Sequence, residues 1–130
     1  MEEILTFLRN CGIFYLATCE DGQPHGRPFG SVCAYEGRLY LVTNNQKNVY
    51  RQILSNPQVE ICGLYQDQWA RITGTLALDE RREARAAMLE DNPSLSEMYA
   101  VDDQLMVVLY FTQAEMTVYL PGGQTQTCAF

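Results

Sequence analysis

The chain has 130 residues, 47% of them hydrophobic, which suits one domain with a packed core. Its 16 acidic and 9 basic residues give a net charge of −7, which argues against general affinity for nucleic acid or for an anionic membrane surface. The five cysteines are scattered and there is one histidine, so we expect no metal site. The sequence shows neither a basic leader nor a long apolar run, which predicts a protein of the reducing cytoplasm.

In chain order, the predicted elements alternate between strands and short helices. Residues 2–10 read as an amphipathic helix, followed by strands over 13–19, 24–35 and 38–43, which Asp-Gly and Glu-Gly turns separate. A helix over 46–55 and strands over 59–65 and 69–78 come next, then helices over 80–90 and 95–100 and strands over 105–111 and 116–120. Residues 121–130 are predicted to be a loose tail. Successive hairpins with inserted helices indicate an antiparallel α+β barrel, as a single domain over residues 1–130.

The only lysine, Lys47, lies where a strand passes into a helix. The short polar side chains of Thr43, Asn44 and Asn45 suit a helix N-terminus, so Lys47 is predicted in the first turn. Free backbone N–H groups and the helix dipole favour an anion there. A cation opposes that dipole, so one interpretation is a bound phosphate and the other is an ordinary surface lysine.

A second candidate cation, Arg27, lies between Gly26 and Pro28 on a strand that begins after a tight turn. A planar guanidinium can hold a phosphate through two parallel hydrogen bonds. The alternative is a salt bridge at a strand end. The only histidine, His25, has no Ser, Cys or Asp partner nearby, so we expect it to pack or face solvent and not to act as a base.

Taken together, these segments resemble the pyridoxamine 5′-phosphate oxidase-like family of FMN-binding split barrels. The motifs that carry the resemblance are Leu16-Ala17-Thr18, Asp21 to His25, Arg27-Pro28, Leu39 to Asn44, Lys47, Asn56 to Val59, and Arg71 to Gly74. Their order and spacing hold across residues 10–80. The resemblance implies a six-stranded antiparallel split β-barrel with a few short helices, which dimerises and holds FMN between its subunits.

The resemblance also assigns FMN-binding roles to particular residues. The set is Arg27, Pro28, Phe29, Gly30, Thr43, Asn44, Lys47 and Trp69. Arg27 and Lys47 are expected at the phosphate, residues 28–30 along the edge of the flavin ring, and Trp69 near the ring system, with Arg71 as a second candidate there. The loop between Thr43 and Lys47 is shorter than in larger family members.

The resemblance and the aromatic content both predict a homodimer. Phe14, Tyr35, Tyr110 and Tyr119 give the short strands more apolar surface than one small barrel needs. A twofold axis is the commonest way to cover such a surface, so we expect two equivalent sites near the interface. The alternative places all four aromatics in the monomer core.

The chain departs from the true oxidases in its C-terminal region. It lacks their Trp- and Arg-containing final segment and has no further basic cluster for a second phosphorylated ligand, so oxidation of pyridoxamine phosphate is not expected. The leading hypothesis is a small FMN-dependent oxidoreductase that takes electrons from a reduced nicotinamide and passes them to an unknown small acceptor. The alternatives are a flavin store or sensor without turnover, binding of haem or a deazaflavin, with His25 as the only axial ligand candidate, or an acidic barrel that binds no cofactor.

Overall fold

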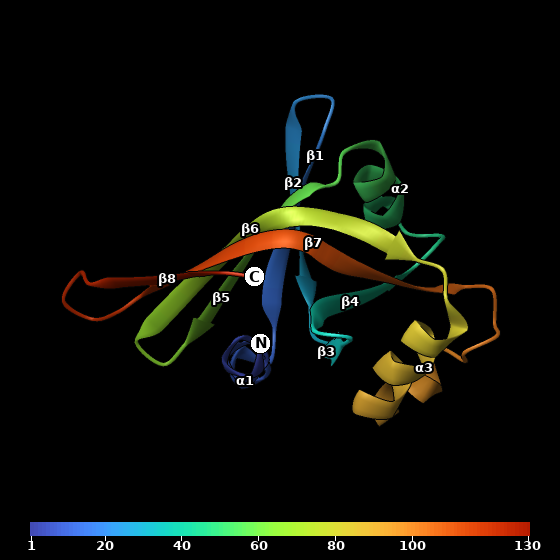
Figure 1. Cartoon of the computed structure of the whole chain (residues 1–130). Coiled ribbons are helices and arrows are strands. Elements are labelled where there is room, and N and C mark those ends of the chain that lie inside the picture. The colour runs from blue at the N-terminus through green and yellow to red at the C-terminus, as the bar shows by residue number, and fades with distance from the viewer.

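A computed structural model describes residues 1–130 as one curved antiparallel sheet with helices packed against it (Figure 1). The elements are α1 (Glu2–Cys11), β1 (Phe14–Glu20), β2 (Gln23–Phe29), β3 (Val32–Tyr35), β4 (Arg38–Asn44), α2 (Asn48–Ser55), β5 (Gln58–Tyr65), β6 (Gln68–Asp79), α3 (Arg82–Asp91), the 3₁₀ segment η1 (Pro93–Glu97), β7 (Met106–Tyr119) and β8 (Thr125–Ala129). The strand order is β2-β1-β5-β6-β7-β4-β3, and β8 pairs with β7 outside this path. The predicted antiparallel α+β architecture is confirmed, with eight strands in place of six.

Two tight turns were predicted from sequence and both form. Asp21 and Gly22 have φ of 51° and 80°, and Glu36 and Gly37 have φ of 50° and 76°. Two successive residues with positive φ match the right-handed twist of paired strands, and glycine enters that region without strain. These turns fix the β1–β2 and β3–β4 registers.

The strand predicted over 24–35 is two strands, and the break between them opens the sheet. β2 pairs with β1 and β3 pairs with β4, so these consecutive strands lie at opposite ends of the strand order. The chain leaves the sheet at Gly30 and Ser31. A hypothetical Cβ at Gly30 would lie 3.5 Å from Ile13 Cδ1, an ordinary van der Waals contact, so the bend does not itself require glycine. The strand alternation on both sides hides this crossing from a sequence pattern.

The two strands predicted over 105–111 and 116–120 are one continuous strand, β7. The polar residues between them resemble a loop, but they pair with β6, with a register irregularity at Thr75 and Leu76. Gly74 is required by the close approach of β6 and β7, because an added Cβ would lie 2.4 Å from the Gln113 carbonyl oxygen. The tail expected to be loose forms β8 and pairs with the end of β7; its exposed, polar side chains gave no strand signal.

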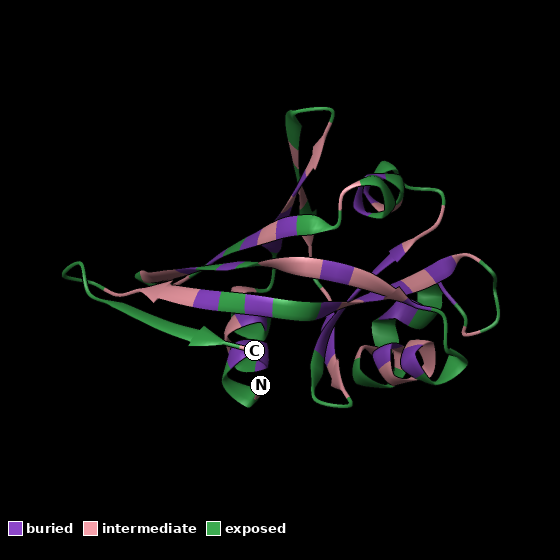
Figure 2. Cartoon of the chain, turned by 45° about the horizontal axis from the view of Figure 1, so that its top comes forward, coloured by how far each residue is buried: buried purple, intermediate pink, exposed green.

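Most of the core lies between the inner face of the sheet and helices α1 and α2, and a second cluster lies beneath α3 and η1. Figure 2 shows β8 exposed along its length, whereas the longest run of buried residues lies in β4. The predicted buried face of α1, with Ile4, Leu5 and Leu8, is confirmed. No helix has the length and apolar character needed to span a membrane.

The aromatic residues expected to supply a dimer surface are divided between core and surface. Phe14 is buried, and Tyr35 and Tyr110 pack around the buried Tyr40 ring with centroid distances of 5.9 and 5.5 Å. Tyr119 stacks on Trp69 at 4.0 Å near the far end of β6 and β7. The large apolar side chains that are exposed are Ile13, Tyr15, Leu54, Leu64 and Met98.

Candidate functional site

A cavity of about 180 Å³ lies where β2 ends, β4 ends and α2 begins; we call it the Arg27–Lys47 cleft. Its lining residues are Arg27, Pro28, Phe29, Gly30, Ser31, Val42, Thr43, Lys47, Val49, Leu95, Met98 and Tyr99. Six of the eight residues that the resemblance assigned to FMN are therefore brought together here. Arg27 and Lys47 do not come from neighbouring strands, because β2 and β4 are not hydrogen-bonded to each other in the sheet.

The cleft is electropositive within an acidic protein. Its lining contains Arg27 and Lys47 and no Asp or Glu. The basic residues that form ion pairs all lie elsewhere: Arg9, Arg51, Arg71, Arg81 and Arg82. Two cations without a carboxylate partner in one cavity, in a chain of net charge −7, are the arrangement expected of an anion site.

Lys47 occupies the N-cap position of α2, one residue before the predicted first turn, with extended backbone angles of φ −84° and ψ 148°. No side chain caps this helix end. The first N–H groups of a helix have no partner within the helix, and Lys47 and Val49, at this end of α2, both line the cavity. Backbone donors and the lysine charge therefore favour an anion at one place.

Thr43 at the end of β4 carries the clearest ligand signal in the cleft. Its side chain is 3% exposed, and its Oγ1 is the one buried side-chain polar atom that has no hydrogen-bond partner in the protein. Buried hydroxyls are nearly always hydrogen-bonded, because an unmade bond costs about 1–3 kcal/mol. An acceptor bound in the cleft would satisfy this hydroxyl.

The Arg27 side chain donates hydrogen bonds to residues of β1, β2 and α2. Its Nη1 donates to the Leu16 carbonyl at 3.1 Å, to Thr18 Oγ1 at 2.8 Å and to the His25 carbonyl at 3.2 Å, and its Nη2 donates to Gln52 Oε1 at 2.6 Å. Burial lowers the pKa of the guanidinium from its usual value, and no carboxylate opposes this effect. The salt bridge considered for Arg27 is absent.

The two remaining predicted residues lie outside the cleft lining. Asn44 donates from Nδ2 to the Tyr99 hydroxyl at 3.0 Å, so it supports a lining residue and does not line the cavity itself. Trp69 is the second residue of β6, and the order β2-β1-β5-β6 puts three strand spacings, about 14 Å, between its strand and that of Arg27. It stacks on Tyr119 with the Arg71 guanidinium 4.9 Å from its ring centroid, and neither Trp69 nor Arg71 lines the cleft.

Several lining residues of the cleft, and one residue that supports it from behind Arg27, were missed by the sequence reasoning. Leu95, Met98 and Tyr99 come from η1 and the residues after it, and nothing local in their sequence marks them. Gln52 could have been found, because it shares the buried face of α2 with Val49 and Ile53. A polar residue on the apolar face of an amphipathic helix indicates a specific buried partner.

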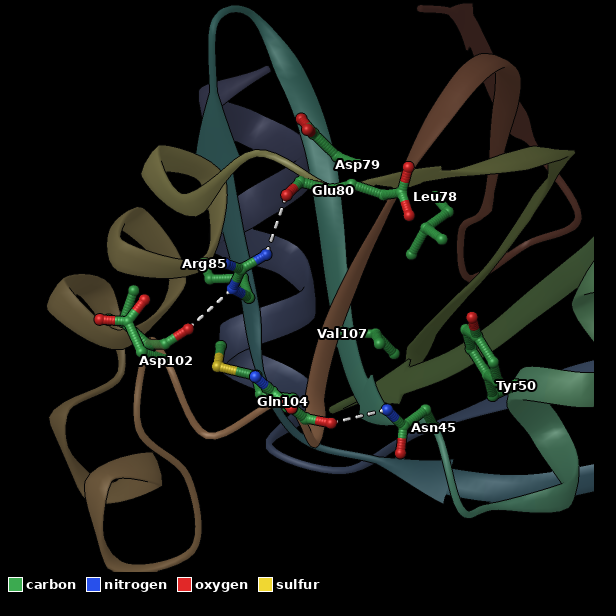
Figure 3. Close-up of a pocket in the computed structure, with 11 residues that line it drawn as sticks. Asn45, Tyr50, Leu78, Asp79, Glu80, Arg85, Asp102, Gln104 and Val107 are labelled. Atoms are coloured by element: carbon green, nitrogen blue, oxygen red, sulfur yellow. Dashed lines mark hydrogen bonds between the residues drawn. The ribbon is translucent and has the colours of Figure 1, made fainter.

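A larger cavity of about 400 Å³ lies between β4, the end of β6, α3 and residues 101–107, but its one arginine already bonds to acceptors within the protein (Figure 3). Arg85 donates to the carbonyls of Val101 at 2.8 Å and Glu80 at 3.0 Å, and Asn45 donates to the Gln104 carbonyl at 2.8 Å. Asp79, Glu80 and Asp102 also line it, so its charge disfavours an anion. No unpartnered buried atom points to a ligand there.

The fold agrees with the comparisons to known proteins. The pyridoxamine 5′-phosphate oxidase family model matches residues 1–116, so the chain belongs to this family and its sheet is the predicted split barrel. A NimC/NimA family protein from Clostridium acetobutylicum is 49% identical, with a TM-score of 0.97 over 100% of this chain and 92% of that chain. A comparison with curated proteins found no match.

Two more distant structures share the fold. One is a pyridoxamine 5′-phosphate oxidase-related, FMN-binding protein from Nostoc punctiforme, with 18% identity and a TM-score of 0.67 over 99% of this chain and 95% of that chain. The other is a haem-binding protein from Mycobacterium smegmatis, with 15% identity and a TM-score of 0.73 over 93% of this chain and 57% of that chain. The two proteins share the fold with this chain, although one is described as FMN-binding and the other as haem-binding.

Proposed function

We propose that this protein binds FMN in the Arg27–Lys47 cleft and acts as a small oxidoreductase that uses a reduced nicotinamide as electron donor. The observation that carries the proposal is the convergence of two unpaired cations and the unpartnered Thr43 hydroxyl in a cavity without acidic residues. A phosphate satisfies all three groups together. The final electron acceptor stays open.

The cleft residues have distinct tasks in this proposal. Arg27 and Lys47 hold the phosphate, Thr43 donates its hydroxyl hydrogen to it, and residues 28–30 border the flavin ring. The flavin supplies the redox chemistry, whereas the protein supplies binding, orientation and control of access. No third cation lines the cleft, so a second phosphorylated ligand, as pyridoxamine phosphate oxidation requires, is not supported. All five cysteines are free thiols, which fits a role in the reducing cytoplasm.

We further propose that two copies of the chain complete each site. The cleft of about 180 Å³ is smaller than the roughly 300–1,000 Å³ typical of sites for drug-sized ligands. Tyr15 pairs with Pro28 of the cleft edge on one side and with Cys62 on the other, so the outward-facing surface of β1 and β5 adjoins the cleft. A second copy on that surface would bring its Trp69 toward the flavin, as the resemblance implies.

Binding and its phosphate dependence form the first test. FMN and riboflavin, which lacks the phosphate, are titrated into the apoprotein and its variants, with flavin fluorescence as the readout. Losing one charged hydrogen-bond partner costs about 1.5–3 kcal/mol, so Lys47→Ala and Arg27→Ala should each weaken FMN roughly 10- to 100-fold. Riboflavin affinity should change little.

The matched control is Arg51→Ala, which removes an α2 charge that pairs with Glu20 and lies outside the cleft. Its FMN affinity should equal that of the wild type. Unchanged FMN affinity in Lys47→Ala and Arg27→Ala together would remove the phosphate assignment.

Mass spectrometry of the ligand that copurifies distinguishes FMN from haem and deazaflavins. Haem has little support here, because His25 does not line the cleft.

Turnover is a separate question from binding. NADH or NADPH is added anaerobically to the FMN-loaded protein, and the flavin absorbance is followed before and after a small acceptor such as a quinone or a nitroaromatic is added. Repeated reduction and reoxidation supports the oxidoreductase. Tight FMN binding without reduction by either nicotinamide supports the alternative, a flavin store or sensor.

A further inference from the structure

We propose that Gln52 is a positioning residue, which aims the Arg27 guanidinium into the cleft and, being neutral, leaves its full positive charge available to an anion. The proposal rests on the proposed function in one respect: the anion is the FMN phosphate. Gln52 does not line the cleft and acts only through Arg27.

The contacts place Gln52 at the centre of a buried polar network. Its side chain is 4% exposed, and its Oε1 accepts hydrogen bonds from Thr18 Oγ1 and from Arg27 Nη2, both at 2.6 Å. Thr18 Oγ1 in turn accepts from Arg27 Nη1 at 2.8 Å. The three side chains come from α2, β1 and β2, so the network fixes the guanidinium against the sheet. A buried polar acceptor is tolerated when its hydrogen bonds are made, and the two to Oε1 are made here.

The same contacts leave part of the guanidinium free. Arginine has five N–H groups, two on each Nη and one on Nε. The Arg27 bonds to protein acceptors use Nη1 and one hydrogen of Nη2. The Nε hydrogen and the second Nη2 hydrogen have no protein acceptor, and such a pair can hold two phosphate oxygens.

The neutrality of Gln52 matters because a carboxylate there would form an ion pair with Arg27. Glutamate has the same length and could accept the same two hydrogen bonds. It would cancel the Arg27 charge inside the protein and leave Lys47 as the only uncompensated cation of the cleft. The amide therefore combines rigid positioning with retained charge.

The test compares Gln52→Glu with the wild type in thermal unfolding of the apoprotein and in titrations with FMN and riboflavin. Gln52→Glu should fold with an unchanged or higher Tm, bind FMN at least about tenfold more weakly, and bind riboflavin within about twofold of the wild type. Gln58→Glu is the matched control, because it adds the same charge at an exposed site outside the cleft and should behave as wild type. Gln52→Met removes the acceptor at similar length and should also weaken FMN more than riboflavin.

A double-mutant cycle shows whether Gln52 acts through Arg27. In the Arg27→Ala background, Gln52→Glu should have no further effect on FMN affinity, whereas independent sites would give additive losses. The proposal is overturned if Gln52→Glu binds FMN as tightly as the wild type, or weakens FMN and riboflavin equally. A wild type that does not prefer FMN to riboflavin overturns the phosphate assignment and this inference together. A preference that Gln52→Glu leaves intact overturns the inference alone.

Discussion

At the scale of single residues, the Thr43 hydroxyl is expected to lower the stability of the apoprotein and to strengthen ligand binding. Its buried Oγ1 has no partner, so Thr43→Val should raise the free energy of unfolding of the apoprotein by about 1 kcal/mol. The same change should weaken FMN, because the phosphate loses a donor. Chemical denaturation without ligand and fluorescence titration with FMN measure the two effects.

Thr18→Val is the control for Thr43→Val, since it makes the same change at a hydroxyl bonded to both Gln52 and Arg27. It should destabilise the apoprotein, because it leaves buried partners unsatisfied. If Thr43→Val destabilises the apoprotein as much as Thr18→Val does, the Thr43 hydroxyl has a partner within the protein and is not reserved for a ligand.

The sequence allowed prediction of the residues that carry charge or sharp backbone geometry in the cleft. Arg27, Thr43 and Lys47 could be recognised as candidates from the residues next to them in the sequence. Tyr99 could not be predicted, because it lies some fifty positions after Lys47 in the chain and reaches the cleft through the packing of η1. The placement of Trp69 away from the cleft follows from strand order, which no local pattern encodes.

At the scale of elements, Asp79 ties the end of β6 to β4 and to the start of α3. It accepts hydrogen bonds from the Tyr40 hydroxyl at 2.7 Å and from Arg81 Nη2 at 2.9 Å, Nε at 3.1 Å and backbone N–H at 3.0 Å. Hydrogen bonding from Arg81, and then from Tyr40, lowers the pKa of Asp79 to about 2, although burial opposes the shift. Burial and the neighbouring carboxylate raise the pKa of Tyr40 above its usual value.

This depressed pKa predicts a pH dependence of stability. A carboxyl whose pKa is lower in the folded than in the unfolded chain stabilises the fold above its unfolded pKa of about 3.9, and the contribution is lost as pH falls toward 2. Arg81 is half exposed, so we expect a contribution on the order of 1–2 kcal/mol at neutral pH. Asp79→Asn should lose that amount at pH 7 and almost none near pH 2.

Urea unfolding at a series of pH values between 7 and 2 measures the difference between wild type and Asp79→Asn. Asp102→Asn is the control, because Asp102 forms an exposed pair with Arg82 and its removal should matter less. Parallel stability curves for wild type and Asp79→Asn across this range would contradict the assignment. The hydrogen bonds of Asp79 with Tyr40 and Arg81 were not predicted, because the three residues come from three separate elements.

At the scale of the whole molecule, the outer face of the sheet is the surface without a partner. Tyr15 and Leu64 point outward and are 56% and 66% exposed, and cross-strand pairing continues this face from Leu64 to the stacked Trp69 and Tyr119. The class of fold could be predicted, because the patterns that indicate strands and helices depend only on residues that are close together in the sequence. The exposure of this face depends on curvature and strand order, which is why Phe14 was expected on a dimer surface and lies in the core instead.

A homodimer through this face gives the last prediction. Sedimentation equilibrium of the FMN-loaded protein should give twice the chain mass of 14.8 kDa, and Leu64→Asp should give the monomer, because it places a desolvated charge in the interface. Leu54→Asp is the matched control: Leu54 is 56% exposed but lies on α2, so this variant should remain dimeric. Leu64→Asp should also bind FMN more weakly, since each cleft would lose the partner subunit's contribution. A wild-type monomer that binds FMN tightly would show that one chain forms the whole site. A Leu64→Asp variant that stays dimeric with unchanged affinity would show that the interface does not include this face.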